Sequence, residues 1–235
     1  MNAAEAARKL EDLLGLRFHP VAIAFRPSPT AGVSRISASA PSGCTYWKLA
    51  AEGQVFYTEA ADHYNCPVGA HTHGIDLPPG KEAELQGLIG TMLDLGYLRE
   101  AEIASIPRRK APFGVAIYSP WALSPCDPDV ILLRGSAKQL MLLTEAARAA
   151  GVSGTEEIMG RPTCAMIPAA LARQGAATSL GCIGNRVYTG LEDGELYAVI
   201  AGGKIATVLA ELPAIVEANR QLEAFHRERA ASRSR

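Results

Sequence analysis

Four of the five cysteines lie in two segments with the same order of features, and this repetition is the clearest sign of chemistry in the sequence. Cys44 begins the first segment and Cys66 closes it, while Cys164 and Cys182 hold the same places in the second. Each segment reads as a cysteine, a short apolar helix, a glycine, a strand, a cysteine and a glycine. Two such units packed about a pseudo-twofold axis would bring four thiols together. The sequence therefore predicts one metal centre with four cysteine ligands.

Four thiolates suit either structural zinc or an iron–sulfur cluster. Zinc knuckles usually supply two ligands only a few residues apart, whereas the closest pair here, Cys164 and Cys182, is separated by 18 positions. A cubane is larger than one ion and can be held from several sides. Cys66-Pro67 also resembles the Cys-Pro that closes bacterial ferredoxin motifs. We therefore expect a [4Fe–4S] cluster, with zinc as the alternative.

A second interpretation treats the cysteines as small apolar core residues, which free cysteines often are. It is the stronger interpretation for Cys126, which has no counterpart in the other segment and is expected outside the ligand set. For the other four, the local sequence favours ligation. Cys44 and Cys164 should start helices, where free N–H groups favour a thiolate. Cys66 and Cys182 should lie in glycine-flanked turns, whose N–H groups can approach inorganic sulfur.

Polar residues near the cysteines are candidates for catalysis. Asp62 and His63 lie just before the second cysteine and could move protons. Arg161 and Arg186 lie within four residues of the third and fourth, where they could balance an anionic cluster or hold a carboxylate or phosphate substrate. Surface ion pairing is the simpler alternative for the arginines. Neither His63 nor Arg186 is expected in the apolar core.

His71 and His73 would face the same side of an extended segment and could together bind a metal or a substrate, unless they are merely exposed polar residues. A rival function is a non-enzymatic module that binds a small ligand or regulates, with zinc or no metal at the cysteines. The aromatic residues expected to line its pocket are Tyr46, Trp47, Tyr57 and Tyr64.

The overall composition excludes several classes of function. With 23 basic and 24 acidic residues, the chain gives no electrostatic case for nucleic acid. No apolar run reaches the ~20 residues of a membrane helix, and residues 1–17 do not resemble a signal peptide, so we expect a cytoplasmic protein. Walker, GxGxxG, HExxH and nucleophile-elbow motifs are missing from the sequence. The expected partners are a small-molecule substrate or a redox protein.

These residues need a scaffold, and the pattern predicts a single α/β domain over 1–235. Its mixed sheet should be covered by helices and built from two pseudo-repeated halves, about 17–80 and 111–205. Strands are expected at 21–25, 55–58, 113–118, 130–133, 177–180 and 195–200. Beyond the two cysteine segments, helices are expected at 3–14, 85–93, 136–147 and about 212–229, the last with Pro213 in its first turn. Residues 227–235 read as a frayed, basic terminus.

Several ordered motifs carry a family resemblance across nearly the whole chain. They are Pro20-Val-Ala-Ile-Ala-Phe25, Cys44-Thr-Tyr-Trp47, Asn65-Cys66-Pro-Val-Gly69, Pro128-Asp-Val130 and Ser179-Leu-Gly-Cys182-Ile-Gly-Asn-Arg186. With them the chain resembles the uncharacterised prokaryotic family called domain of unknown function 169. The resemblance implies a cytoplasmic bacterial or archaeal protein with these cysteine motifs, and it implies no reaction.

Overall fold

The computed structural model describes residues 2–233. Its strands are β1 (Val21–Arg26), β2 (Phe56–Glu59), β3 (Val115–Pro120), β4 (Val130–Ser136), β5 (Ile158–Met159), β6 (Ala176–Ser179) and β7 (Glu195–Ala201). Its α-helices are α1 (Ala3–Leu14), α2 (Gly43–Ala51), α3 (Pro67–His73), α4 (Pro79–Asp94), α5 (Glu100–Ile103), α6 (Ala137–Ala149), α7 (Met166–Arg173), α8 (Ile183–Thr189) and α9 (Ile205–Arg233). Four short 3₁₀ turns are η1 (Ala60–His63), η2 (Trp121–Leu123), η3 (Thr163–Ala165) and η4 (Gly202–Lys204).

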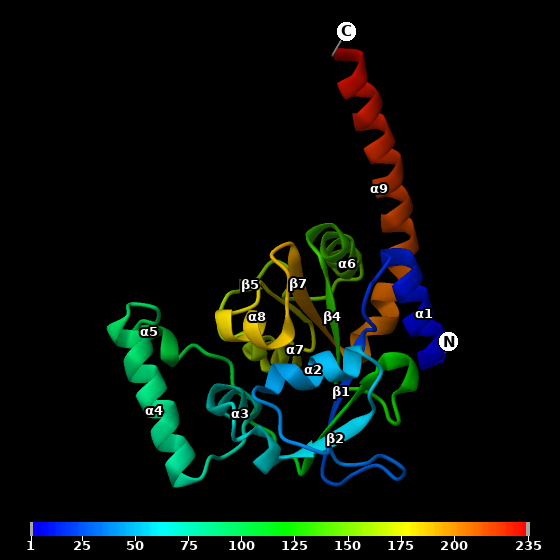
Figure 1. The fold of residues 1–235 in the computed structure, drawn as a ribbon. Helices are drawn as coiled ribbons and strands as arrows, with labels where there is room; N and C mark the ends of the chain where they lie inside the picture. The colour runs from blue at the N-terminus through cyan, green and yellow to red at the C-terminus, as the bar shows by residue number, and fades with distance from the viewer. Residues whose placement is uncertain (1, 234–235) are drawn as a thin grey trace.

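The strands form one seven-stranded sheet in the order β2-β3-β1-β4-β7-β6-β5. All neighbours run antiparallel except β5 and β6, which are parallel. The predicted mixed sheet with helices is therefore confirmed (Figure 1). β1 and β3, whose similar sequences suggested equivalent places in two halves, are instead direct neighbours, with Val21 opposite Pro120. The pseudo-repeated halves stay a prediction.

Alternate residues of each central strand face opposite sides of the sheet, because side chains along a strand alternate. On β4, Val130 and Leu132 pack into a core under α2 and α7, together with Cys44 and Cys164. The intervening residues of β4 pack into a second core under α1, α6 and α9. The sheet thus separates the face that carries the four paired cysteines from an opposite face whose core under α1, α6 and α9 contains none.

The helices on the face opposite the four paired cysteines follow their sequence signals at most ends. An Asn2–Glu5 capping box starts α1, and Gly15 ends it with φ 62°. The Ser136–Gln139 capping box opens α6 as predicted. The predicted start of the last helix is wrong: α9 begins at 205 and contains Pro213 in its interior.

Pro213 cannot donate to the carbonyl of Leu209 four residues earlier, and this would normally break a helix. In this protein Lys9 of α1 donates to that carbonyl from Nζ at 3.0 Å. The helix therefore continues, and residues 227–233, predicted to be frayed, are helical.

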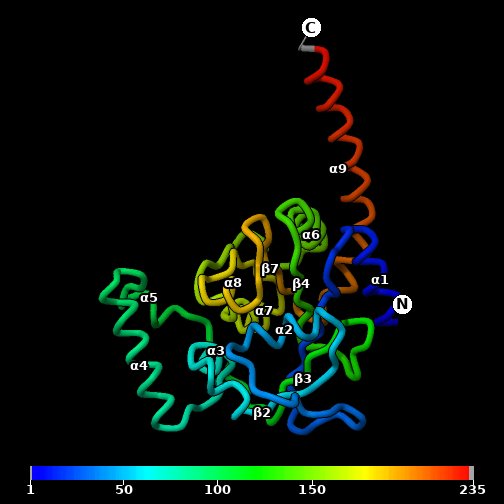
Figure 2. The backbone as a smooth tube through the Cα atoms, viewed as in Figure 1, coloured from blue at the N-terminus to red at the C-terminus, as the bar shows by residue number. Residues whose placement is uncertain are grey.

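α4 and α5 project away from the sheet as an arm, defined here as residues 79–103 (Figures 1 and 2). The arm leaves the body after α3 and returns beside the same helix, where the Arg109 N–H donates to the Thr72 carbonyl at 2.8 Å. Gly74 lies at this junction with φ 78°, and a Cβ there would lie 2.3 Å from the Arg109 carbonyl oxygen. Only glycine fits this position. Across residues 2–233, the helices are all too short or too polar to cross a membrane.

Candidate functional site

Each of the four paired cysteines lies where a helical segment begins. Cys44 is the second residue of α2, and Cys164 lies in η3, directly before α7. These two positions agree with the prediction. Cys66 and Cys182, expected in glycine-flanked turns, are the N-cap residues of α3 and α8, so each directly precedes a helix.

These helical segments approach one another across the two parts of the chain. α2 packs against α8, and α3 packs against η3. A hydrogen bond of 2.6 Å from the Cys182 N–H to Thr163 Oγ1 joins the residue before α8 to η3, which contains Cys164. The chain therefore brings the four cysteines, 18 to 138 positions apart in sequence, to one side of the sheet.

The thiols are close enough to affect one another's ionisation. Burial raises the pKa of the Cys44 thiol well above its ordinary value. The neighbouring thiols of Cys164, Cys66 and Cys182 raise it further. Burial also raises the pKa of Cys164, and Cys66 and Cys182 add to the effect. In the protein alone these two groups are neutral thiols, and the helix starts do not by themselves produce thiolates.

Polar side chains lie beside both buried thiols. Asn185 of α8 lies beside Cys44 and lowers its pKa, while the Thr72 hydroxyl of α3 does the same for Cys164. Asn185 is only 2% exposed, and neither its amide oxygen nor its amide nitrogen has a well-formed hydrogen bond. Sequence reasoning missed both residues as parts of the site, although Asn185 stands three positions after a proposed ligand, inside a motif that carries the family resemblance.

Two buried histidines near the cysteines present bare ring nitrogens. His73 Nδ1 lies 2.7 Å from the Gly69 carbonyl oxygen, which can only accept, so Nδ1 carries the proton. His63 Nε2 lies 2.8 Å from Thr58 Oγ1, whose own hydrogen points to the Ala116 carbonyl. His63 Nε2 is therefore the donor in that contact. The other ring nitrogen of each residue, His63 Nδ1 and His73 Nε2, is a lone pair without a hydrogen-bond partner.

The two imidazole rings lie 5.9 Å apart and are both about 1% exposed. Burial lowers the pKa of His63 to about 3, with a further contribution from His73. Burial also lowers the pKa of His73. Both rings are neutral at physiological pH. His63 thus belongs to the protein interior, contrary to the expectation that it lies outside the core.

The predicted pairing of His71 with His73 is wrong, because residues 67–73 form helix α3 and not an extended segment. Positions two apart on a helix point to different sides. His71 is exposed, whereas His73 is buried against the rings of Phe25 and His63.

The Asp62 carboxylate is held by hydrogen bonds from neighbouring groups. Its carboxylate accepts hydrogen bonds from Arg35 at 3.0 and 3.1 Å and from the Glu59 N–H at 2.8 Å. Burial raises the pKa of Asp62, but these bonds more than offset it, and the net pKa is lowered. The Asp62 carbonyl accepts from the Tyr46 hydroxyl at 2.6 Å. These bonds fix the turn that carries His63.

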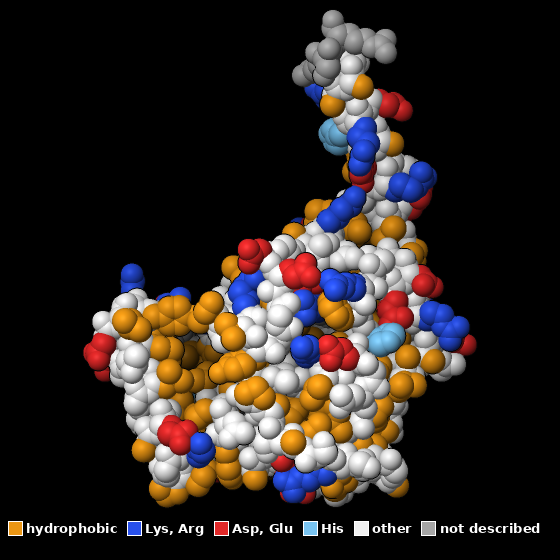
Figure 3. All heavy atoms as spheres, viewed as in Figure 1, with side chains coloured by type: hydrophobic (Ala, Val, Ile, Leu, Met, Phe, Trp, Pro, Cys, Tyr) orange, Lys and Arg blue, Asp and Glu red, His pale blue; other side chains and the backbone are white. Residues whose placement is uncertain are grey.

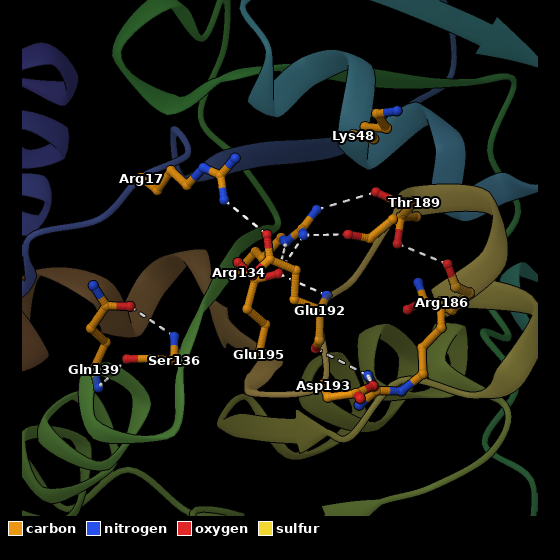
Figure 4. Close-up of polar contacts among 12 residues, drawn as sticks. Arg17, Lys48, Arg134, Ser136, Gln139, Arg186, Thr189, Glu192, Asp193 and Glu195 are labelled. Carbon is orange, nitrogen blue, oxygen red and sulfur yellow. Dashed lines mark hydrogen bonds and ion pairs between the residues drawn. The ribbon is translucent and has the colours of Figure 1, made fainter.

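Arg134, which sequence reasoning did not single out, holds the end of α8 (Figure 4). From β4 it donates to the carbonyls of Thr189 and Gly190 at 3.2 and 2.6 Å and pairs with Glu195 at 2.9 Å. Cations at the last turn of a helix satisfy its free carbonyls. Arg134 therefore fixes the helix that carries Asn185.

Arg186 and Arg161 also have local partners. Arg186 donates to the Glu192 carbonyl after α8 at 3.1 Å (Figure 4) and to the Leu180 carbonyl before α8 at 2.6 Å. Arg161 pairs with Glu102 of the arm at 3.4 Å. These contacts secure Cys182 and the arm, and they leave neither guanidinium without a partner.

The expected aromatic pocket does not form among residues 2–233. Tyr46 and Trp47 are core residues, with ring contacts to Tyr118 and Tyr197 respectively. Trp47 also borders a small hollow under α2, lined further by Phe18, His19, Val21, Lys48, Ala51, Leu132, Arg134 and Tyr197. Tyr57 and Tyr64 are half-buried and do not line it.

Over the described residues, no three His, Cys, Asp or Glu side chains gather closely enough to hold a single metal ion. In a tetrahedral zinc site the thiolate sulfurs lie about 3.8 Å apart, as follows from Zn–S bonds of about 2.3 Å. The four thiols are therefore close enough for electrostatic coupling but are not arranged around one point.

A family comparison agrees with this arrangement of motifs. The model of DUF169, described as Uncharacterised ArCR, matches residues 9–211 of the 235. The chain belongs to the DUF169 family. This match includes all four paired cysteines, Asn185 and both buried histidines of the DUF169 protein. Searches of curated proteins and of solved structures gave no match.

Proposed function

We propose that Cys44, Cys66, Cys164 and Cys182 ligate one [4Fe–4S] cluster and that the protein uses it in a redox or electron-transfer role. The observation that carries the proposal is the meeting of four thiols beside buried polar atoms that lack hydrogen-bond partners. Native proteins leave few buried polar atoms unsatisfied. The sulfides of an inorganic cluster would accept hydrogen bonds from the Asn185 amide. Its iron ions would supply the positive charge that stabilises four thiolates.

The wide spacing of the four cysteines in the sequence favours a cluster over zinc. A cubane is larger than one ion, and its irons are bound from four sides. The two pseudo-repeated halves also belong to this proposal. Their bounds, about 17–80 and 111–205, place Cys44 and Cys66 in the first half and Cys164 and Cys182 in the second. Such halves would each supply two ligands.

A redox role gives His63 the best-supported chemical task. Its bare Nδ1 lies at the start of α2, where a Cβ on Gly43 would be 3.7 Å from it. A neutral imidazole there could accept a proton that accompanies an electron. Asp62 and Arg186 would position this region. Arg161 would hold the arm, and a small anionic substrate would need to displace Glu102 from it.

The alternative is a ligand-binding or regulatory module with zinc or no metal. It is favoured by the position of Cys44 and Cys164 in the apolar core, each about 5% exposed, as expected of structural cysteines.

Anaerobic purification from iron-replete cells separates these proposals. The cluster predicts a brown protein with about four irons and four acid-labile sulfides per chain, as the cubane stoichiometry requires. One equivalent of zinc would select the structural-metal alternative. A colourless protein that contains neither metal and cannot be reconstituted with iron and sulfide would contradict the proposal.

A further inference from the structure

A hollow lies between the arm and the body of the protein, and hydrophobic side chains line both of its sides (Figure 3). We call it the arm groove. The arm exposes Leu88, Leu95 and Tyr97, and the body exposes large apolar residues in and just before α8. On the body these are Leu180, Ile183, Val187 and Tyr188. Contiguous exposed apolar surface of this kind marks an interaction site.

A second unpartnered apolar surface lies at the other end of the molecule. Residues 220–233 of α9, which we call the tail, project beyond the body (Figure 1). Leu222 and Phe225 are 56% and 53% exposed and, three positions apart, share one side of this helix. A helical segment this short is marginal in water without a surface to pack on.

Charge decides which surfaces fit each other. The arm carries five acidic and two basic residues, whereas the tail contains four arginines and two glutamates. Contact between two arms or between two tails would bring like charges together, and this is unfavourable. Contact between an arm and a tail would bring opposite charges together around the exposed apolar residues of both surfaces.

We propose that the tail of a second copy of this chain docks in the arm groove. In a twofold dimer each copy would give one tail and receive one, so the assembly closes. Leu222 and Phe225 would pack on Ile183 and Val187, and the arginines would face the acidic arm. This inference is independent of what the cysteines bind.

Two double variants of the full chain test the pairing by sedimentation velocity. Leu222→Asp/Phe225→Asp damages the tail only, and Ile183→Lys/Val187→Lys damages the groove only. All four side chains are more than half exposed, so circular dichroism should show an unchanged fold. Leu123→Lys, at a 59% exposed apolar residue of η2, is the matched control.

The parent and the control should sediment at twice the chain mass, and each double variant at the chain mass. A mixture of the two variants should regain dimer, because an intact tail then meets an intact groove. A monomeric parent would overturn the proposal. So would a groove variant that still dimerises, which indicates tail-to-tail contact, or a tail variant that still dimerises, which indicates groove-to-groove contact.

Discussion

Gly69→Ala is the most direct test of whether Cys66 must keep its position. Gly69 lies in the first turn of α3, and a Cβ there would be 2.9 Å from Cys66 Sγ and 3.6 Å from Cys66 Cβ. Gly80 is the matched control, because it lies in the first turn of α4 and a Cβ there meets nothing within 4 Å. Replacing a helical glycine with alanine stabilises by about 0.5 to 1 kcal/mol when nothing obstructs it.

Gly80→Ala should therefore raise the free energy of unfolding by about that amount. At Gly69 the same gain competes with an overpacking cost of about 1 to 3 kcal/mol. The net effect should be between no change and a loss of about 2.5 kcal/mol. Cys66 Sγ must also move, so iron bound after anaerobic reconstitution should fall well below the parent level.

Urea unfolding of the metal-free proteins gives the energies, and iron and sulfide analysis gives the occupancy. Suppose that Gly69→Ala raises the free energy of unfolding as Gly80→Ala does and that the variant binds as much iron as the parent. Iron binding then does not require Cys66 Sγ to keep its position. That result would contradict the assignment of Cys66 as a cluster ligand. The free energies alone would not decide this, because a relaxed Cys66 could tolerate the methyl group without any ligand role.

Three further outcomes are expected. Cys126→Ser should leave the iron content unchanged, because this residue is absent from the groups that influence the buried thiols; loss of iron would show a wrong ligand assignment. Asn185→Leu should retain the cluster but lower its reduction potential in voltammetry, since a donor beside Cys44 sulfur is removed, and an unchanged potential would argue against that contact. Burial raises the pKa of Glu195, but the hydrogen bond from Arg134 has the larger opposite effect, so the net pKa is lowered. The ionised carboxylate therefore stabilises the fold at pH values above its unfolded pKa near 4.5. That contribution should be lost as the pH falls through the lower folded pKa, and Glu195→Gln should show a smaller loss of unfolding free energy over the same acid range.

Most strands, and most helices of the face opposite the four paired cysteines, were predictable because their signals are local. Val21–Arg26 is a buried apolar run between prolines, and the capping box of α6 is written within four residues. The repeated order of cysteine, helix, strand and cysteine likewise predicted that Cys44 and Cys164 begin helical segments.

The remaining features depend on distant partners. The helix through Pro213 requires Lys9, which lies 200 positions from Leu209, the acceptor. α3 contains proline, glycine and two histidines in seven residues, a composition typical of a loop, yet the His73 ring donates to the Gly69 carbonyl within the helix. Asp62 and Arg186 resembled functional groups because a sequence does not show that Arg35 and backbone carbonyls occupy them.

The division of the core by the sheet bears on how a cluster could be acquired. The core beneath α1, α6 and α9 contains no cysteine and buries Leu10, Ile131 and Leu140 among others. It can hold the sheet together before any metal arrives, unlike small zinc domains, in which metal binding supplies the folding energy. On the other face the raised pKa of Cys44 keeps that group protonated until a cation compensates its charge. Cluster insertion would therefore release a proton from Cys44, with Cys66 and Cys182, the half-buried members of the four paired cysteines, accessible first.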